Sequence, residues 1–290
     1  MVRLENEDYF SHRLWDILLP RGGFIVVFEA YADAGGVNGP ILSVANFLFK
    51  KDAADALNEE WATMLAPILK DQPKHKQYFH MHDFFTRKGP YSYMNDGERD
   101  ALQRDLIDSA HKHMEHGVVA SIRRADYEAQ VTSDNQRDAL GSPFAMCNLW
   151  CMSALAEHLE GTNLNGDIAY AFEDGDNDKK DLEIRLAKIE ASQYLRQKYR
   201  YYSGRTFLPK HAHHALAAAD MLSWEFRNAA QQYFESPEAK YRKFLDVLFA
   251  KPLGAQHLDP IQIRFRNLAQ SMERANMWAE ERNDGASRQT

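Results

Sequence analysis

The sequence has little cysteine and no long hydrophobic run. Its only two cysteines in 290 residues, Cys147 and Cys151, are four apart on one expected helix face. This spacing argues against a disulfide framework and favours reduced, buried thiols in an intracellular protein. No apolar stretch reaches the roughly 18 residues that a membrane span needs, and the acidic segment 1–8 lacks the apolar core of a signal peptide. We therefore expect a cytoplasmic protein with no membrane partner.

Positive charge is also scarce. The 35 Lys and Arg residues against 42 Asp and Glu give a formal net charge of −7, which argues against a general nucleic-acid coat but not against a local basic groove. Glycine-rich phosphate loops of the Walker or Rossmann type are missing. Residues 174–178 imitate a calcium loop, but Lys179 and Arg185 stand where that loop requires Gly and Glu, so we reject a calcium site.

What the sequence does contain is an alternation of strand and helix patterns. We expect strands at 24–32, 41–49, 117–123, 167–173 and 204–208, a short strand candidate at 77–82, and a hairpin formed by the first two strands. Helices are expected at 9–19, 51–69, 97–115, 178–199, 212–231, 238–249 and 261–282, and over about 18 residues from Ser142-Pro143. The pattern predicts an α/β fold with a mixed sheet flanked by helices. We place the main domain at 1–250 and a helical extension with a tail at 251–290.

Carboxylates follow two of the expected strands. Asp33 ends the apolar run 24–33 just before Gly35-Gly36, and Glu173 ends the run 168–173. Ligands gather at the carboxyl ends of strands in open α/β sheets, so the two acids converge if their strands are parallel neighbours. Asp220 is a third candidate, because three alanines before it let a helix approach the sheet closely.

Three converging carboxylates cannot all stay ionised without a cation. Mg²⁺ or Mn²⁺ would meet this need, and such ions support phosphodiester hydrolysis. Simpler interpretations also stay open: Asp33 as a turn residue, Glu173 as a helix cap and Asp220 as a paired helix charge.

Histidines and cations form two further groups of candidates. His80 and His82 share one face of the strand candidate, and His80 or Asp83 could orient water or a ligand. His211, His213 and His214 are expected on a solvated surface. Residues 194–205 interleave cations and aromatic rings that could bind phosphates and stack on bases. The alternative for this tract is a helix end whose cations complement the helix dipole. The candidate nucleic-acid residues are Arg196, Lys198, Tyr199, Arg200 and Arg205.

Four ordered stretches resemble a known prokaryotic family. They are 30–36 (AYADAGG), 78–84 (YFHMHDF), 172–176 (FEDGD) and 217–225 (AAADMLSWE), and the family is the domain of unknown function 3800 (DUF3800), whose fold is of the ribonuclease H type. The resemblance implies a ribonuclease H-like mixed sheet. It also implies that Asp33, Glu173 and Asp220 are the metal-binding acids of a nuclease, with His80 and Asp83 nearby.

The sequence departs from the family pattern next to the first acid. Ala34 replaces the family's Glu, Gly35 replaces its Ser, and Ala217 replaces the Gln before the Ala-Ala-Asp segment. Our leading hypothesis is a Mg²⁺- or Mn²⁺-dependent nuclease acting on RNA or DNA, with RNA slightly favoured. The alternative is a non-catalytic module with a decayed site that binds nucleic acid or a protein partner. The oligomeric state stays open and includes a homo-oligomer.

Overall fold

The computed structural model describes residues 27–175, 178–202, 206–238, 240–251 and 253–259. Its centre is a mixed sheet with strand order β5-β4-β1-β2-β3-β6. The strands are β1 (Val27–Gly35), β2 (Ile41–Lys50), β3 (His116–Arg123), β4 (Asp167–Glu173), β5 (Thr206–Leu208) and β6 (Leu253–Leu258). β2 is antiparallel to β1 and β3, whereas the pairs β1–β4, β4–β5 and β3–β6 are parallel.

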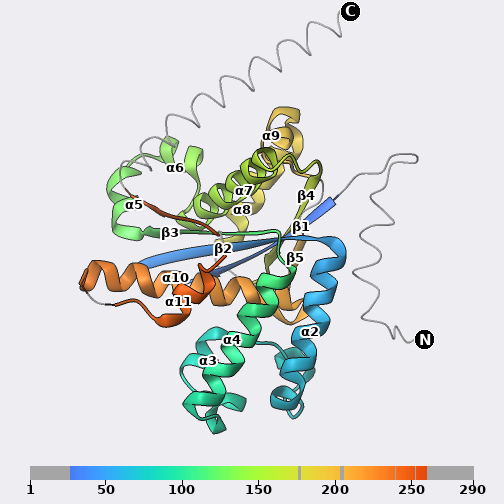
Figure 1. Cartoon of the computed structure of the whole chain (residues 1–290). Helices are drawn as coiled ribbons and strands as arrows, with labels where there is room; N and C mark the ends of the chain where they lie inside the picture. The colour runs from blue at the N-terminus through green and yellow to red at the C-terminus, as the bar shows by residue number, and fades with distance from the viewer. Residues whose placement is uncertain (1–26, 176–177, 203–205, 239, 252, 260–290) are drawn as a thin grey trace, which may run out of the picture.

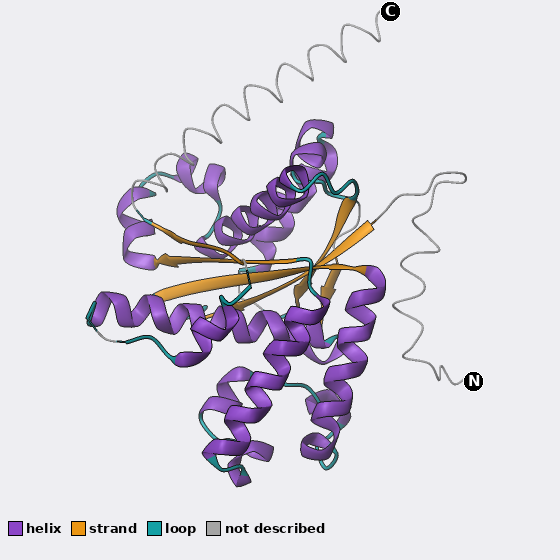
Figure 2. Cartoon of the chain, in the orientation of Figure 1, coloured by secondary structure: helices purple, strands orange, loops and turns teal. Residues whose placement is uncertain are grey.

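Helices cover both faces of the sheet (Figures 1 and 2). One face carries α7 (Pro143–Gly161), α8 (Lys179–Ala191) and α9 (Gln193–Lys198), with α5 (Arg124–Gln130) and α6 (Asp134–Leu140) at its edge. The other carries α2 (Lys51–Leu69), α3 (Met81–Phe85), α4 (Asp96–His113), α10 (His214–Glu235) and α11 (Lys243–Leu248). The predicted α/β architecture is therefore confirmed.

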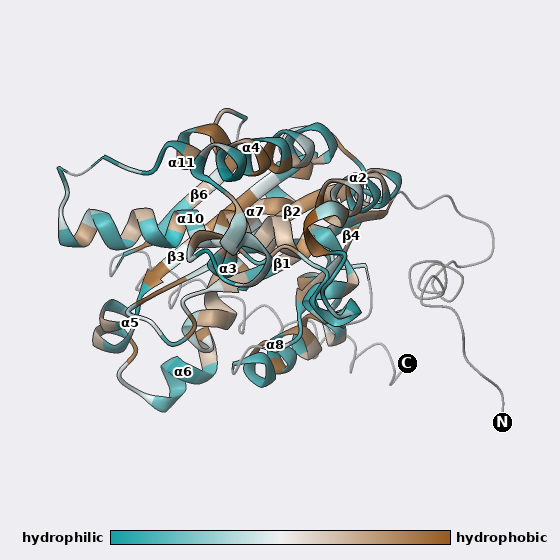
Figure 3. Ribbon diagram, turned by 90° about the horizontal axis from the view of Figure 1, so that it is seen from below, coloured by the Kyte–Doolittle hydropathy of each residue, from teal (hydrophilic) through white to brown (hydrophobic). Residues whose placement is uncertain are grey.

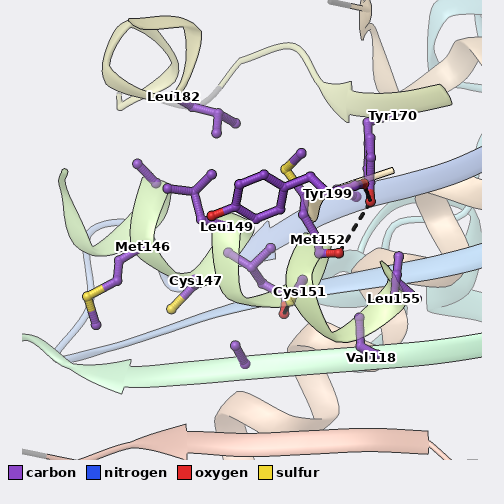
Figure 4. Packing of buried hydrophobic residues seen from close by; sticks show 14 of the residues in the cluster. Val118, Met146, Cys147, Leu149, Cys151, Met152, Leu155, Tyr170, Leu182 and Tyr199 are labelled. Atoms are coloured by element: carbon purple, nitrogen blue, oxygen red, sulfur yellow. Dashed lines mark hydrogen bonds between the residues drawn. The ribbon is translucent and has the colours of Figure 1, made fainter. Parts of the chain in front are cut away.

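Each face of the sheet has its own hydrophobic core. Tyr170, Phe172 and residues of α7 fill the first, where the Tyr170 hydroxyl donates to the carbonyls of Met152 and Tyr199 at 3.3 and 3.0 Å (Figure 4). Tyr31, Trp61 and residues of α10 fill the second. The brown hydrophobic segments of Figure 3 gather at the sheet, as alternating strands and amphipathic helices require.

Helix α7 is apolar nearly all round because it is buried, as its sequence predicted. Within the described part of the chain, one helical stretch, Asp134–Gly161, is long and apolar enough to cross a membrane. However, 78% of its apolar window is buried inside the fold. Packing against the sheet therefore accounts for the composition of this stretch.

Several predicted elements were wrong. Residues 77–82 form no strand, because Met81 begins α3. The single helix expected at 178–199 is two, since Ser192 ends α8 and caps α9 by accepting from the Leu195 N–H at 3.3 Å. The strand β6 was not expected, and it extends the sheet by pairing with β3. The helices expected at 9–19 and 261–282 lie outside the described residues.

Candidate active site

Strand pairing brings the two strand-end acids to the same edge. β1 and β4 are parallel neighbours with Ala32 opposite Phe172, so Asp33 and Glu173 are the next residues along each strand. Both lie on the α10 face, because Tyr31 and Ala171, two residues before each, belong to the core beneath α10. This is the arrangement on which the predicted convergence depended.

Helix α10 supplies the third acid. Its first half, from Ala215 to Glu225, is buried throughout, and small side chains let it approach β1 closely. At Gly35 an added Cβ would stand only 2.7 Å from the Ser223 hydroxyl oxygen. This close packing turns Asp220 toward the ends of β1 and β4.

The three carboxylates meet around one lysine. The Lys210 ammonium nitrogen lies 2.8 Å from Asp33 Oδ2, 3.5 Å from Asp220 Oδ1 and 3.8 Å from Glu173 Oε1. Only 11% of the Lys210 side chain and 7% of the Asp220 side chain are exposed, and the Asp33 side chain is fully buried. The site is thus an acidic cluster with an internal counter-ion.

The second carboxylate oxygens of Asp33 and Asp220 each accept from a backbone amide. The Ala34 N–H donates to Asp33 Oδ1 at 2.6 Å, and the Met81 N–H donates to Asp220 Oδ2 at 2.8 Å. The second bond ties the start of α3 to the acidic cluster. His80 is the residue just before Met81, so this bond brings the His80 segment to the site.

Burial and neighbouring charges shift the pKa values of the cluster residues in opposite directions. Burial raises the pKa of the Asp33 carboxyl well above its ordinary value; Lys210 opposes this rise, while Asp220 and Glu173 add to it. Burial favours the neutral amine of Lys210, but the three carboxylates outweigh it and raise the pKa of Lys210 above its ordinary value. Lys210 is therefore a firmly charged ammonium at neutral pH.

Tyr78 and His80 belong to the segment that the Met81 amide ties to the cluster. His80 Nδ1 lies 3.1 Å from Asp83 Oδ2, with 34% and 44% of the two side chains exposed. Burial raises the pKa of Tyr78, which also responds to the charges of Lys210, Glu173 and Asp220. The predicted pair His80 and Asp83 is thus joined at the margin of the site. His82 does not share a strand face with His80, because it belongs to α3.

Two of the three histidines expected on the surface are partly buried. The His213 ring stacks on Tyr31 with centroids 4.4 Å apart, and its Nδ1 accepts from the Ala215 N–H at 3.2 Å to cap α10. Burial lowers the pKa of His213 to about 3 and that of His214 to about 4. Only His211 is exposed. The expectation of a solvated group was wrong because these residues anchor the N-terminus of α10.

The predicted nucleic-acid tract lies at the opposite end of β4. The Ile168 N–H donates to the Arg200 carbonyl at 2.6 Å, beside the start of β4, whereas Glu173 ends that strand. Tyr199 is buried in the core under α7 and offers no ring for stacking. Arg196 is exposed, Lys198 and Arg200 are partly exposed, and Arg205 lies outside the described residues. Residues 194–202, the described part of the tract, therefore do not form one surface with the acids.

Lys210 is the site residue that the sequence analysis missed. It begins a short 3-10 turn, Lys210–Ala212, between β5 and α10, where no periodicity indicates side-chain direction. The one signal was its place ten residues before Asp220, in the connection that leads into the alanine-rich helix.

Comparisons with known proteins add little. No protein-family model matches this sequence, and neither does any curated protein. Among solved structures, the chain is similar to one described as the PCNA:RNase HII complex from Archaeoglobus fulgidus, with 12% sequence identity and a TM-score of 0.39. The match covers 74% of this chain and 80% of the other. A similarity of this size carries no functional argument.

Proposed function

We propose that this protein is a metal-dependent nuclease that hydrolyses phosphodiester bonds of RNA or DNA, of the DUF3800 type with a ribonuclease H-like sheet. One observation carries the proposal: Asp33, Glu173 and Asp220, from two parallel strands and a helix, meet around one ammonium, with Asp33 and Asp220 buried and 20% of Glu173 exposed. Burying three carboxylates together is costly for the free energy of folding. Such a cluster is typical of sites selected for chemistry.

The donor set suits a hard divalent cation by its chemistry. All three side chains offer carboxylate oxygens, which Mg²⁺ and Mn²⁺ prefer, and Lys210 compensates only one of three negative charges when all are ionised. Within the described residues, no group of three His, Cys, Asp or Glu side chains has the spacing of a preformed metal site. We infer that the carboxylates draw closer when a divalent ion is bound. That ion would supply Lewis acidity for attack of water on a phosphodiester.

The protein's own groups have separable roles in this proposal. Asp33, Glu173 and Asp220 would hold the ion. His80, paired with Asp83, is the candidate for holding or moving a proton at its imidazole, since it directly precedes Met81, whose amide binds Asp220, and is one-third exposed. The Met81 N–H fixes Asp220 and thereby the distance between the His80 segment and the acids.

The alternative is a non-catalytic binding module, which two observations favour: Lys210 stands among the acids, and Ala34 replaces the family's Glu. The geometry weakens the second of these. Side chains alternate along β1, and Ala34 packs against the core under α7, on the face opposite to Asp33. A Glu side chain at position 34 would leave the sheet on the face opposite to Lys210. The replacement of Glu by Ala34 therefore takes no carboxylate away from Lys210.

The test is hydrolysis of single-stranded RNA and DNA in Mn²⁺ by the wild type and by Asp33→Asn. Loss of an outer-shell partner of a metal typically costs 10–100-fold, so loss of a ligand is expected to cost about 100-fold or more. Asp174→Asn is the matched control, because Asp174 follows Glu173 in the chain but pairs with Lys179 at 2.7 Å instead of Lys210. Equal cleavage by wild type and Asp33→Asn would refute the nuclease assignment.

A further inference from the structure

The Lys210 ammonium is built into the centre of the acidic cluster. Its nitrogen is within 4 Å of all three carboxylates, and no other cation of the described residues forms an ion pair with them. Lysine carries a compact point charge on a flexible stem. Here that stem is nearly enclosed, with 11% of the side chain exposed. A surface lysine that pairs by chance would remain hydrated.

Charge balance limits what else the cluster can hold. Three ionised carboxylates and one ammonium leave two negative charges, which one divalent ion neutralises. A second divalent ion would leave an excess of two positive charges in a buried site, where unbalanced charge is costly.

The position of the Lys210 ammonium also argues against a second divalent ion. The two ions of a two-metal site lie about 4 Å apart and share carboxylates. The ammonium is in direct contact with Asp33 at 2.8 Å, whereas Asp220 and Glu173 are more distant at 3.5 and 3.8 Å. Asp33 is thus the main partner of the ammonium, and the other two acids keep more of their capacity for a divalent ion.

We propose that Lys210 takes the place of a second metal ion, so that the site binds one divalent cation per chain. This inference rests on the proposed metal-dependent function and specifies its metal content. Lys210 is then a positioning residue that sets charge and metal number, and its removal should change metal binding as well as activity.

The test is a titration of the full-length protein with Mn²⁺, with free Mn²⁺ followed by electron paramagnetic resonance. We expect one Mn²⁺ per wild-type chain. Lys210→Met should bind a second Mn²⁺, or bind the first at least about tenfold more tightly, since a repelling charge worth about 1.4 kcal/mol is a factor of ten. Lys210→Arg keeps the charge and should keep one ion. Lys243→Met is the matched control, because Lys243 pairs with Asp100 on the surface.

The outcomes separate this inference from the proposed function. Two Mn²⁺ per wild-type chain, or unchanged binding by a folded Lys210→Met, would overturn the role of Lys210. Binding by Lys210→Met but none by wild type would also overturn it, because Lys210 would then be the sole cation. The wild-type stoichiometry decides even if Lys210→Met fails to fold. One bound Mn²⁺ without hydrolysis supports this inference and refutes only the nuclease.

Discussion

At Asp33, burial and charge conflict more directly than at the other two acids. Its side chain is fully buried, its pKa is raised by that burial, and its compensation comes from Lys210 at 2.8 Å and the Ala34 amide at 2.6 Å. Proteins tolerate such a conflict mainly where the group has a function. The cost to stability should therefore be measurable in the metal-free protein.

A pH series on Asp33→Asn measures that cost. The pKa of this carboxyl is higher in the folded protein than in the unfolded chain, where it is about 4. The carboxyl therefore contributes free energy of folding that is fully present below about pH 4 and is lost as pH rises through the folded pKa. Asn does not titrate. The free energy of unfolding of wild type minus that of Asp33→Asn should therefore fall as pH rises from about 4, by at most about 1.4 kcal/mol per pH unit. Urea unfolding in EDTA at several pH values checks this, and a difference that rises with pH contradicts it.

His80 should matter for turnover and His82 should not. His80 is paired with Asp83 and adjoins the residue whose amide holds Asp220, whereas His82 is exposed on α3. Loss of a general acid–base group typically costs about 10²–10⁴ in rate. We expect His80→Ala to lose at least about 100-fold in kcat with little change in melting temperature, while His82→Ala stays near wild type. Equal changes of kcat in both variants would contradict a role for His80 in turnover.

The three acids could be predicted from the sequence, but their counter-ion could not. Strand periodicity, a Gly-Gly turn and a run of alanines restrict where Asp33, Glu173 and Asp220 point. Lys210 reaches the cluster from an irregular turn. The direction of its side chain is set by the fold around it rather than by its neighbours in the sequence.

Among the elements, the contact between β1 and α10 fixes the distance between Asp33 and Asp220. A Cβ at Gly35 would meet the Ser223 hydroxyl oxygen at 2.7 Å, and Ser223 lies one turn beyond Asp220 on α10. The two elements can approach this closely because one contributes glycine and the other contributes small side chains.

Gly35→Ala should therefore damage the site more than the fold. Overpacking of this kind typically costs about 1–3 kcal/mol, and the shift of α10 should also weaken Mn²⁺ binding. Gly161→Ala is the control, because a Cβ there meets nothing within 4 Å. Chemical unfolding and a Mn²⁺ titration of both variants check this. Wild-type Mn²⁺ affinity in Gly35→Ala would show that this contact does not position Asp220.

Elements with a strong period were predictable, and those decided by tertiary pairing were not. The helix expected at 51–69 and the strand at 167–173 match α2 and β4 to the residue, since each has a clear apolar pattern. β6 (LGAQHL) has no such pattern and depends on pairing with β3. The segment 77–82 has a local strand pattern, but the hydrogen bond that the Met81 N–H donates to Asp220 fixes its course.

On the scale of the whole molecule, the basic tract and the acids occupy opposite ends of β4. Arg200 bonds to Ile168, and Glu173 lies five residues further along the strand, about 17 Å away at roughly 3.3 Å per residue. This distance exceeds the Debye length of about 8–10 Å in physiological salt. The tract therefore cannot guide a scissile phosphate directly, and a substrate reaching both must span the sheet.

Reversing charge in that tract should thus leave hydrolysis of a short oligonucleotide nearly unchanged. We expect Arg196→Glu to alter kcat/KM by less than about threefold, because exposed charges at this separation are largely screened. Lys198→Glu provides a second test on the same short helix. A tenfold or greater loss of kcat/KM with short substrates would show that the tract is part of the substrate-binding surface.

The central claim is that the three converging acids form a divalent-metal site. A crystal soaked in Mn²⁺ and measured for anomalous scattering tests it most directly. We predict one anomalous peak bounded by carboxylate oxygens of Asp33, Glu173 and Asp220, with the Lys210 ammonium beside it. An anomalous map with no peak among these side chains, at a Mn²⁺ concentration that supports hydrolysis, would contradict the claim.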